Sequence, residues 1–255
     1  MGMKHQLRNA WAGHAVVSLA LLLLAVRPAC AQKSLDEYAQ PELKDLTASL
    51  KVLSHNNKEL AKIGKDYVDA YTLEHQQFFW KEPGQARIQG NRGPIHILRI
   101  TSGGRQMFEV SGLAVLRNRH TEDVNKKPGK ADTILDLGVF TPAWAQSVES
   151  RWIRAESRDG KTLQVFDFWY PADPGAKHTL WIDPTTKTVV EHVYHGRGKH
   201  NGIKKRFVFG DVKQCNGVEL PTTVCIFNDE GKQAAAMRYE TLKVNESLPD
   251  KLFRF

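Results

Sequence analysis

Apolar residues in the first quarter of the chain recur at spacings of three, four and seven. The stripe comprises Leu43, Leu46, Leu50, Leu53, Leu60 and Ile63. This spacing is typical of an amphipathic helix that buries one face. Ser34 and Glu37 also match a capping box. We therefore predict a helix over residues 34–65, with Pro41 separating a short first turn from the main part.

From residue 67 onward the pattern changes to short segments rich in β-branched and aromatic residues, separated by turn residues. Asp159-Gly160 is a strong hairpin signal, because a type I′ turn needs positive φ at both central positions. Most links are too short for crossover helices, so we expect antiparallel pairing. The predicted strands are 67–80, 86–90, 95–101, 105–118, 151–158, 162–170, 178–183, 188–195, 203–214, 218–228 and 233–244.

Two stretches interrupt the strands. Residues 120–130 are polar and predict an exposed loop. Residues 133–150 are mixed, and Pro142 after Thr141 predicts a short helix with Thr141 as its N-cap.

These elements predict a mainly β (α+β) fold, with a curved antiparallel sheet that forms an incomplete β-barrel. A sheet of about ten strands is large enough to curl, and its concave face needs a cover. We expect the long N-terminal helix and the short mid-chain helix to form that lid. If the lid does not fill the hollow beneath it, an apolar cavity remains.

The first residues have the features of a secretory signal peptide. Lys4 and Arg8 precede an apolar run over 15–26, and Ala29-Cys30-Ala31 follows. The run is shorter than the about 20 residues of a membrane span, and the residues before Cys30 do not suit lipid attachment. We predict cleavage after Ala31, which leaves a single exported domain over 32–255.

The remaining charge and cysteines narrow the picture further. The formal net charge of +8 falls to +5 when Lys4, Arg8 and Arg27 are removed, and the basic residues are scattered, so we expect no nucleic-acid partner. Cys215 and Cys225 remain. A turn at Asn216-Gly217 sets them about 23 Å apart at ~3.3 Å per residue, so we expect no disulfide between them.

Several segments resemble the LolA-like family of outer-membrane lipoprotein-sorting proteins. One runs from Trp80 to Ile88 and carries the sequence WKEPGQARI. The others are LWIDPTT at 180–186, NGVELP at 216–221 and VNESLPDKLF at 244–253. The resemblance covers nearly all of 32–255 in element order. It implies an incomplete β-barrel with a helical lid and a cavity for acyl chains in a periplasmic carrier.

The chain departs from the family pattern in three places. The best-known carriers use an arginine on an early strand to hold the lid, and residues 67–80 contain none. The loop 120–130 and the tail 228–255 also differ from the family pattern. The fold by itself does not settle the function.

A carrier of apolar ligands needs broad apolar contact, because each buried methylene contributes about 0.8 kcal/mol. We expect the cavity to be lined by residues of the helix and of several strands, although each of them also suits ordinary core packing. These residues are Leu46, Leu50, Leu53, Trp80, Ile97, Phe108, Phe168, Trp181, Phe207, Phe209 and Met237.

The sequence offers little chemistry for an enzyme. His192 and His195 fall on opposite faces of a strand, which does not suit a shared metal site, and we interpret them as surface or turn histidines. We find no nucleophile elbow and no phosphate-binding loop. We therefore predict a non-enzymatic, monomeric carrier of lipid or lipoprotein acyl chains, without cofactor or metal and with transient membrane-protein partners. The alternatives are an envelope sensor or protein-interaction module and, third, a hydrolase.

Overall fold

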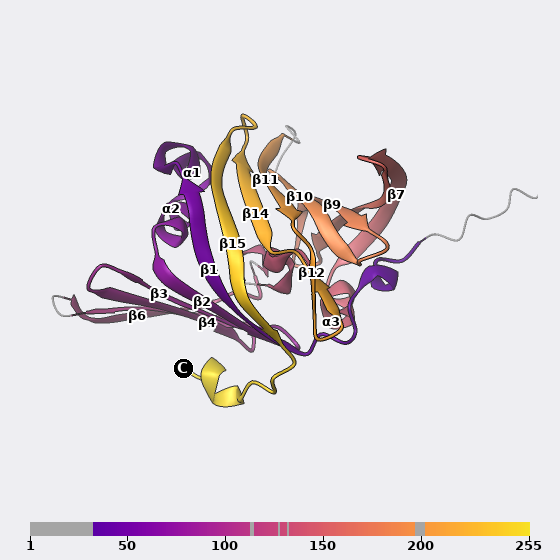
Figure 1. Ribbon diagram of the computed structural model, residues 1–255. Helices are drawn as coiled ribbons and strands as arrows, with labels where there is room; N and C mark the ends of the chain where they lie inside the picture. The colour runs from indigo at the N-terminus through magenta and orange to yellow at the C-terminus, as the bar shows by residue number, and fades with distance from the viewer. Residues whose placement is uncertain (1–32, 113–114, 127, 132, 197–201) are drawn as a thin grey trace, which may run out of the picture. The chain divides into compact units, whose positions relative to one another are not determined.

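The computed structural model describes residues 33–255, apart from 113–114, 127, 132 and 197–201 (Figure 1). The predicted signal peptide, 1–31, lies outside the described residues. No helix in the described part of the chain is long and apolar enough to cross a membrane.

Fifteen strands dominate this part of the chain. They are β1 Asp45–His55, β2 Glu74–Lys81, β3 Gln85–Arg92, β4 Ile95–Ser102, β5 Arg105–Gly112, β6 Val115–Asp123, β7 Glu149–Arg158, β8 Lys161–Tyr170, β9 Asp173–Asp183, β10 Thr188–His195, β11 Ile203–Gly210, β12 Lys213–Cys215, β13 Val218–Leu220, β14 Thr223–Asn228 and β15 Gln233–Val244. The α-helices are α1 Asn57–Ile63, α2 Lys65–Tyr71 and α3 Pro142–Gln146, and the 3-10 turns are η1 Leu35–Tyr38, η2 Pro128–Lys130, η3 Ile134–Leu137 and η4 Asp250–Phe253.

Thirteen of the strands form one antiparallel sheet in the order β6-β5-β4-β3-β2-β1-β15-β14-β11-β10-β9-β8-β7. The strands β12 and β13 form a separate hairpin. Because β6 and β7 are its two edges, the sheet is open and is not closed into a barrel. The predictions of a mainly β fold and of antiparallel pairing are confirmed.

The predicted long helix over 34–65 is wrong. Helical structure at its start is limited to η1, where the Ser34 N–H donates to Glu37 Oε1 at 2.9 Å. Residues 45–55 are the strand β1, which pairs with β2 on one side and β15 on the other. The leucine spacing misled because Leu46 and Leu50 are four apart, which fits both a helix and a strand. Leu46, Ala48, Leu50 and Val52 also recur at every second position, and all four pack on the core.

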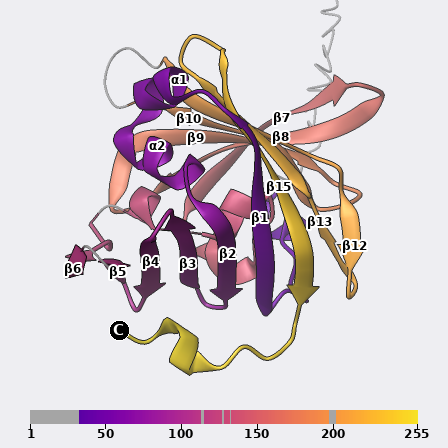
Figure 2. The same cartoon turned by 60° about the vertical axis from the view of Figure 1, so that its left-hand side comes forward.

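The helical residues come directly after β1. The α1 helix is capped by Asn56, whose side-chain oxygen accepts the N–H of Lys58 at 3.0 Å and of Glu59 at 3.3 Å. Gly64 then separates α1 from α2, and the two helices lie side by side (Figure 2). Residues 65–71 are therefore helix, although residues 67–80 are predicted as one strand.

The other predicted strands are found, with four corrections. The segment 105–118 is two strands, β5 and β6, and β6 runs on to Asp123, so part of the predicted loop 120–130 is an edge strand. The segments 203–214 and 218–228 are each divided in two. The strand predicted at 178–183 begins five residues earlier, since β9 starts at Asp173. Asp159 and Gly160 have φ of 50° and 76°, as predicted for this hairpin.

The segment 124–148 connects the two edge strands β6 and β7, so it crosses the whole sheet. It does so on the face that carries Leu46, Phe168 and Met237, which we call the inner face. Eight of its apolar side chains are almost completely buried in the main core: Ile134, Leu135, Leu137, Val139, Phe140, Trp144, Ala145 and Val148. The predicted short helix is confirmed as α3, with the Thr141 hydroxyl accepting the Trp144 N–H.

A second, smaller core covers the opposite face of β4 and β5. It is formed by Ile100 and Met107 together with Leu248 and Phe253 of the C-terminal tail. Lys81 Nζ donates to Leu248 O at 2.8 Å, and Arg87 Nη1 donates to Leu252 O at 3.1 Å. The tail, yellow in Figure 1, therefore supports strands β2 to β5 from outside.

The turn at Asn216-Gly217 forms as predicted. Cys215 lies opposite Val218 in the β12–β13 hairpin, and Cys215 and Cys225 are both free.

Candidate functional site on the inner face of the sheet

Most of the predicted ligand-contacting residues lie on the inner face. Seven belong to the main core: Leu46, Leu50, Trp80, Phe168, Phe207, Phe209 and Met237. Phe108 pairs with Arg99, Arg99 with Ile88, and Ile88 with the core residue Phe78, so Phe108 lies on the inner face. Ile97 is two residues from Arg99 on β4 and therefore lies on the same face. Phe108 is 40% exposed, so the apolar inner face continues beyond the buried core.

Two predicted residues lie elsewhere. Leu53 is 45% exposed and falls outside the core that Leu50 and Val52 contact. The indole N–H of Trp181 donates to Glu156 Oε2 at 3.1 Å, and the Arg158 guanidinium lies 5.3 Å from the ring centroid. Trp181 pairs with Glu191, whereas its neighbour Leu180 pairs with the inner-face residue His192. Trp181 therefore lies on the opposite side of the sheet, which we call the outer face and which is charged at this position.

The centre of the inner face is filled rather than hollow. Side chains of 134–148 occupy it, and the segment 43–63, predicted as a roof, is largely the strand β1. Two surface hollows lie elsewhere. One of about 790 Å³ is lined by Asp211–Cys215 and Arg238–Leu242, and one of about 300 Å³ lies beside the β7–β8 turn. Neither is lined by residues of α1, α2 or α3.

The helices α1 and α2 cover the inner face less completely than 134–148 does. Leu60 and Tyr71 are buried, but Ile63, Tyr67, Val68 and Ala70 are only partly buried against the core. The sheet residues Leu50, Val52 and Ile88 share this intermediate burial. The margin of the α1–α2 cover is therefore apolar and partly accessible to solvent.

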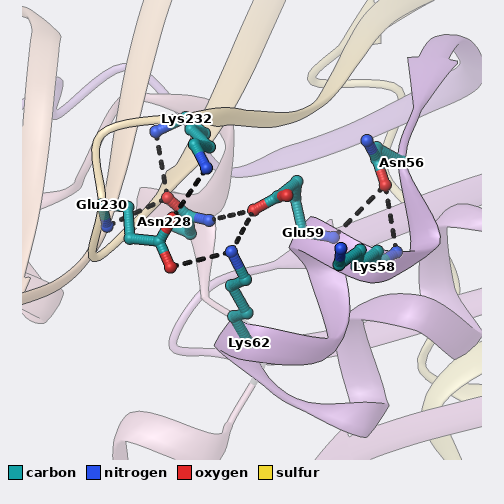
Figure 3. A network of polar contacts seen from close by, with 7 residues as sticks. All are labelled: Asn56, Lys58, Glu59, Lys62, Asn228, Glu230 and Lys232. Carbon is teal, nitrogen blue, oxygen red and sulfur yellow. Dashed lines mark hydrogen bonds and ion pairs between the residues drawn. The ribbon is translucent and has the colours of Figure 1, made fainter.

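A polar network fixes α1 to the β14–β15 turn (Figure 3). Glu59 Oε2 accepts a hydrogen bond from Asn228 Nδ2 at 2.6 Å and pairs with Lys62 Nζ at 2.8 Å. Lys62 also pairs with Glu230 at 2.8 Å, and Lys232 pairs with Glu230 at 2.9 Å. Hydrogen bonds from Lys62 and Lys232 lower the pKa of Glu230 to about 2.

An arginine on β3 fixes the end of α2. Arg92 Nη2 donates to Asp69 O at 2.8 Å, to Asp69 Oδ1 at 3.1 Å and to Thr72 Oγ1 at 2.7 Å. Gln76 Nε2 donates to the carbonyls of Ala70 and Leu73, both at 3.0 Å. Residues 67–80 contain no arginine, as the sequence shows; the arginine that holds the helix comes from the next strand.

A lysine on β11 fixes the start of α2. Lys205 Nζ donates to the Tyr67 hydroxyl and lies 4.7, 5.3 and 5.4 Å from the ring centroids of Tyr67, Tyr194 and Phe207. Ammonium groups are attracted to aromatic ring faces at these distances. The α2 helix is thus held by a cation from each side, Arg92 and Lys205.

A row of stacked rings lies next to this lysine. Phe168 stacks on His178, His178 on His192 and His192 on Phe207. The distances between their ring centroids are 4.5, 5.2 and 5.5 Å. His178 Nδ1 and His192 Nε2 are 2.9 Å apart. Burial, and then the nearby Lys205 charge, lower the pKa of His178 to about 3; burial also lowers the pKa of His192 well below its usual value. Both rings are neutral at pH 7.

The interpretation of His192 as a surface histidine is wrong, because the side chain is only 7% exposed. The opposite placement of His192 and His195 is confirmed, since His195 Nε2 lies 3.0 Å from Thr179 Oγ1, which donates to Asp167 on the outer face. Within the described residues, no group of three or more His, Cys, Asp or Glu side chains could hold a metal ion. His192 pairs with Phe207 across β10 and β11, and His178 comes from β9, so the cluster depends on strand pairing that no local sequence pattern shows.

Searches with family models and with curated protein sequences found no match. Solved structures do match. A DUF1329 family protein from Desulfovibrio piger is 12% identical, with a TM-score of 0.58, over 86% of this chain and 92% of that one. A LolA superfamily protein from Nitrosomonas europaea is 12% identical, with a TM-score of 0.53, over 86% and 94%. The chain has the LolA-like fold.

The predicted resemblance is thereby confirmed at the level of fold. A putative outer-membrane lipoprotein-sorting protein domain from Vibrio parahaemolyticus also matches at 10% identity over 86% and 93%, with a lower TM-score of 0.48. At such identities individual residue roles do not transfer. The function of this LolA-like chain must therefore be argued from its own inner face.

Proposed function

We propose that this protein is a periplasmic carrier that binds the acyl chains of lipids or lipoproteins between the α1–α2 cover and the inner face of the sheet. Outer-membrane lipoprotein sorting is the role that the LolA-like fold favours. The observation that carries the proposal is the contrast between the two covers. Eight apolar side chains of 134–148 are buried in the main core, whereas α1–α2 leaves apolar side chains partly exposed on both the helices and the sheet.

The affinity of such a site comes from burial of apolar surface. Each methylene removed from water contributes about 0.8 kcal/mol, so a long chain needs no specific polar contact to bind. Leu50, Val52 and Ile88 offer apolar contact beside α2, and Ile97 and Phe108 extend it along β4 and β5. The α1 and α2 helices cover these residues only partly, and a bound acyl chain would cover them more completely.

Entry of a chain requires α1–α2 to move away from the sheet. Polar interactions at Glu59, Arg92 and Lys205 hold the helices, and water can replace such contacts more easily than deep apolar burial. Gly64 between the helices adds backbone freedom at their junction. In this proposal α1–α2 opens, while 134–148 stays in place as part of the core.

Export by the predicted signal peptide would place this carrier in the periplasm, where it would meet membrane-protein partners transiently as a monomer. We propose no enzymatic step and no cofactor. An envelope sensor or interaction module of the same fold would differ in one measurable respect, namely that it would bind no acyl chain.

The substitution Leu50→Glu tests the site directly. Leu50 lies on β1 between Gln76 and Tyr239, and a carboxylate there would oppose an apolar ligand. We expect affinity for a fluorescent fatty acid to fall at least tenfold in a fluorescence titration. Leu53→Glu, the same change three residues along at an exposed position, is the matched control and should bind as the wild type does.

Circular dichroism checks that both variants are folded, and Leu50→Ser replaces Leu50→Glu if the latter is not. Equal affinity of folded Leu50 variants and wild type contradicts a site beneath α1–α2. Absence of binding by the wild type contradicts the carrier function itself.

A further inference from the structure

Lys205 is a cation whose surroundings in the described structure are aromatic rather than acidic. Three rings surround the ammonium group, from α2, β10 and β11. Among the described residues, no carboxylate lies within ion-pair distance of it. Asn228, which pairs with Lys205 across β14 and β11, binds Glu59, and Glu59 is neutralised by Lys62. The positive charge is therefore left for another partner.

The hydrogen-bonding capacity of Lys205 is also incompletely used. An ammonium group has three N–H donors, and the described contacts use one of them, on the Tyr67 hydroxyl. Aromatic faces attract the charge but do not replace strong hydrogen-bond acceptors. The side chain is half-buried at the margin of α2, so an anionic group can reach it from solvent.

We propose that Lys205 binds the anionic headgroup, carboxylate or phosphate, of the amphiphile whose acyl chain lies beneath α1–α2. This inference rests on the proposed carrier function and names the ligand class for the same site. The neutral pair His178 and His192 adds no competing charge, and Tyr194 and Phe207 continue the apolar wall towards the core.

Headgroup binding also acts on the cover. An anionic oxygen is a better acceptor for an ammonium than a phenol is, so it would displace the Tyr67 hydroxyl from Lys205. Since Tyr67 belongs to α2, the arriving headgroup weakens one of the contacts that hold the helix closed. Ligand recognition and opening are thus linked at one residue.

The test compares a fluorescent long-chain fatty acid with its methyl ester at pH 7.5, in wild type, Lys205→Met and Lys204→Met. The wild type should bind the acid about tenfold more tightly than the ester, as one charge-assisted hydrogen bond predicts. Lys205→Met should lose this preference and keep the affinity for the ester. Lys204→Met, on the adjacent exposed residue, should retain the preference.

Lys205→Arg keeps the charge and should retain most of the preference; it also serves if Lys205→Met is unfolded. Equal wild-type affinity for acid and ester overturns the headgroup site but leaves the carrier function standing. Failure of both ligands to bind overturns the carrier function as well. Displacement of the bound acid by millimolar inorganic phosphate would indicate a free-anion site and contradict a lipid headgroup; we expect none.

Discussion

At the scale of single residues, the inner face combines apolar side chains with basic groups that burial keeps neutral or that aromatic rings surround. His178 and His192 are hydrogen-bonded to each other between Phe168 and Phe207. Desolvation disfavours the charged form of a buried histidine, and their lowered pKa values follow from this. The same desolvation makes the stability of the protein depend on pH.

We expect this dependence to be measurable at His178. The pKa of His178 is about 3 in the folded protein and about 6.5 in the unfolded chain. Below pH 6.5 the unfolded chain therefore binds more protons, and stability falls as the pH falls. Between pH 7.5 and pH 5, urea unfolding should show the wild type losing about 2 kcal/mol more than His178→Gln. The same substitution at the exposed His55 is the control, and equal losses in wild type and His178→Gln contradict the assignment.

At the scale of elements, the strands of the sheet were largely predictable because turn residues mark their ends. Asp159-Gly160 and Asn216-Gly217 locate two hairpins directly. The helices were not predictable in the same way. The leucines of β1 satisfy a helical period by coincidence, and Tyr67, Val68 and Tyr71 have strand propensity but lie in α2. Packing on the inner face decides both cases, and packing is not visible in local sequence.

The break between β11 and β12 and the residue that anchors α2 could not be predicted from local sequence either. Residues 203–214 read as one strand, but the positive φ of 53° at Asp211 ends β11 and separates it from β12. Arg92 was missed as an anchor because it reaches α2 from the neighbouring strand. The apolar composition of the candidate site was predictable, whereas the identity of its cover was not.

The anchoring of α2 by Arg92 leads to a prediction about local opening. Arg92→Gln removes hydrogen bonds to Asp69 and Thr72, each of which involves a charged donor. We expect amide hydrogen exchange in α2 to accelerate about tenfold, with exchange in 134–148 unchanged. Arg154→Gln, which removes an exposed pair with Glu156 on the edge strand β7, is the control. Equal exchange in α2 of Arg92→Gln and wild type would show that Arg92 does not hold the helix.

At the scale of the whole described structure, the sheet order explains why the inner face has two different covers. The strands β6 and β7 are neighbours in sequence but lie at opposite edges, so 124–148 must cross the sheet and fills its centre. The link from β1 to β2 joins adjacent strands; α1 and α2 are therefore a local excursion that can move without unpairing the sheet. Binding by displacement of this local cover, rather than in a preformed cavity, is the account that the architecture supports.

Hydrogen exchange of the wild type, with and without a saturating long-chain fatty acid, tests this central claim most directly. We predict that the fatty acid changes protection in α1, α2 and the strands beneath them, including β1 around Leu50, and leaves 134–148 unchanged. A change confined to 134–148 or to the outer face of the sheet, or no change at any peptide, would contradict it.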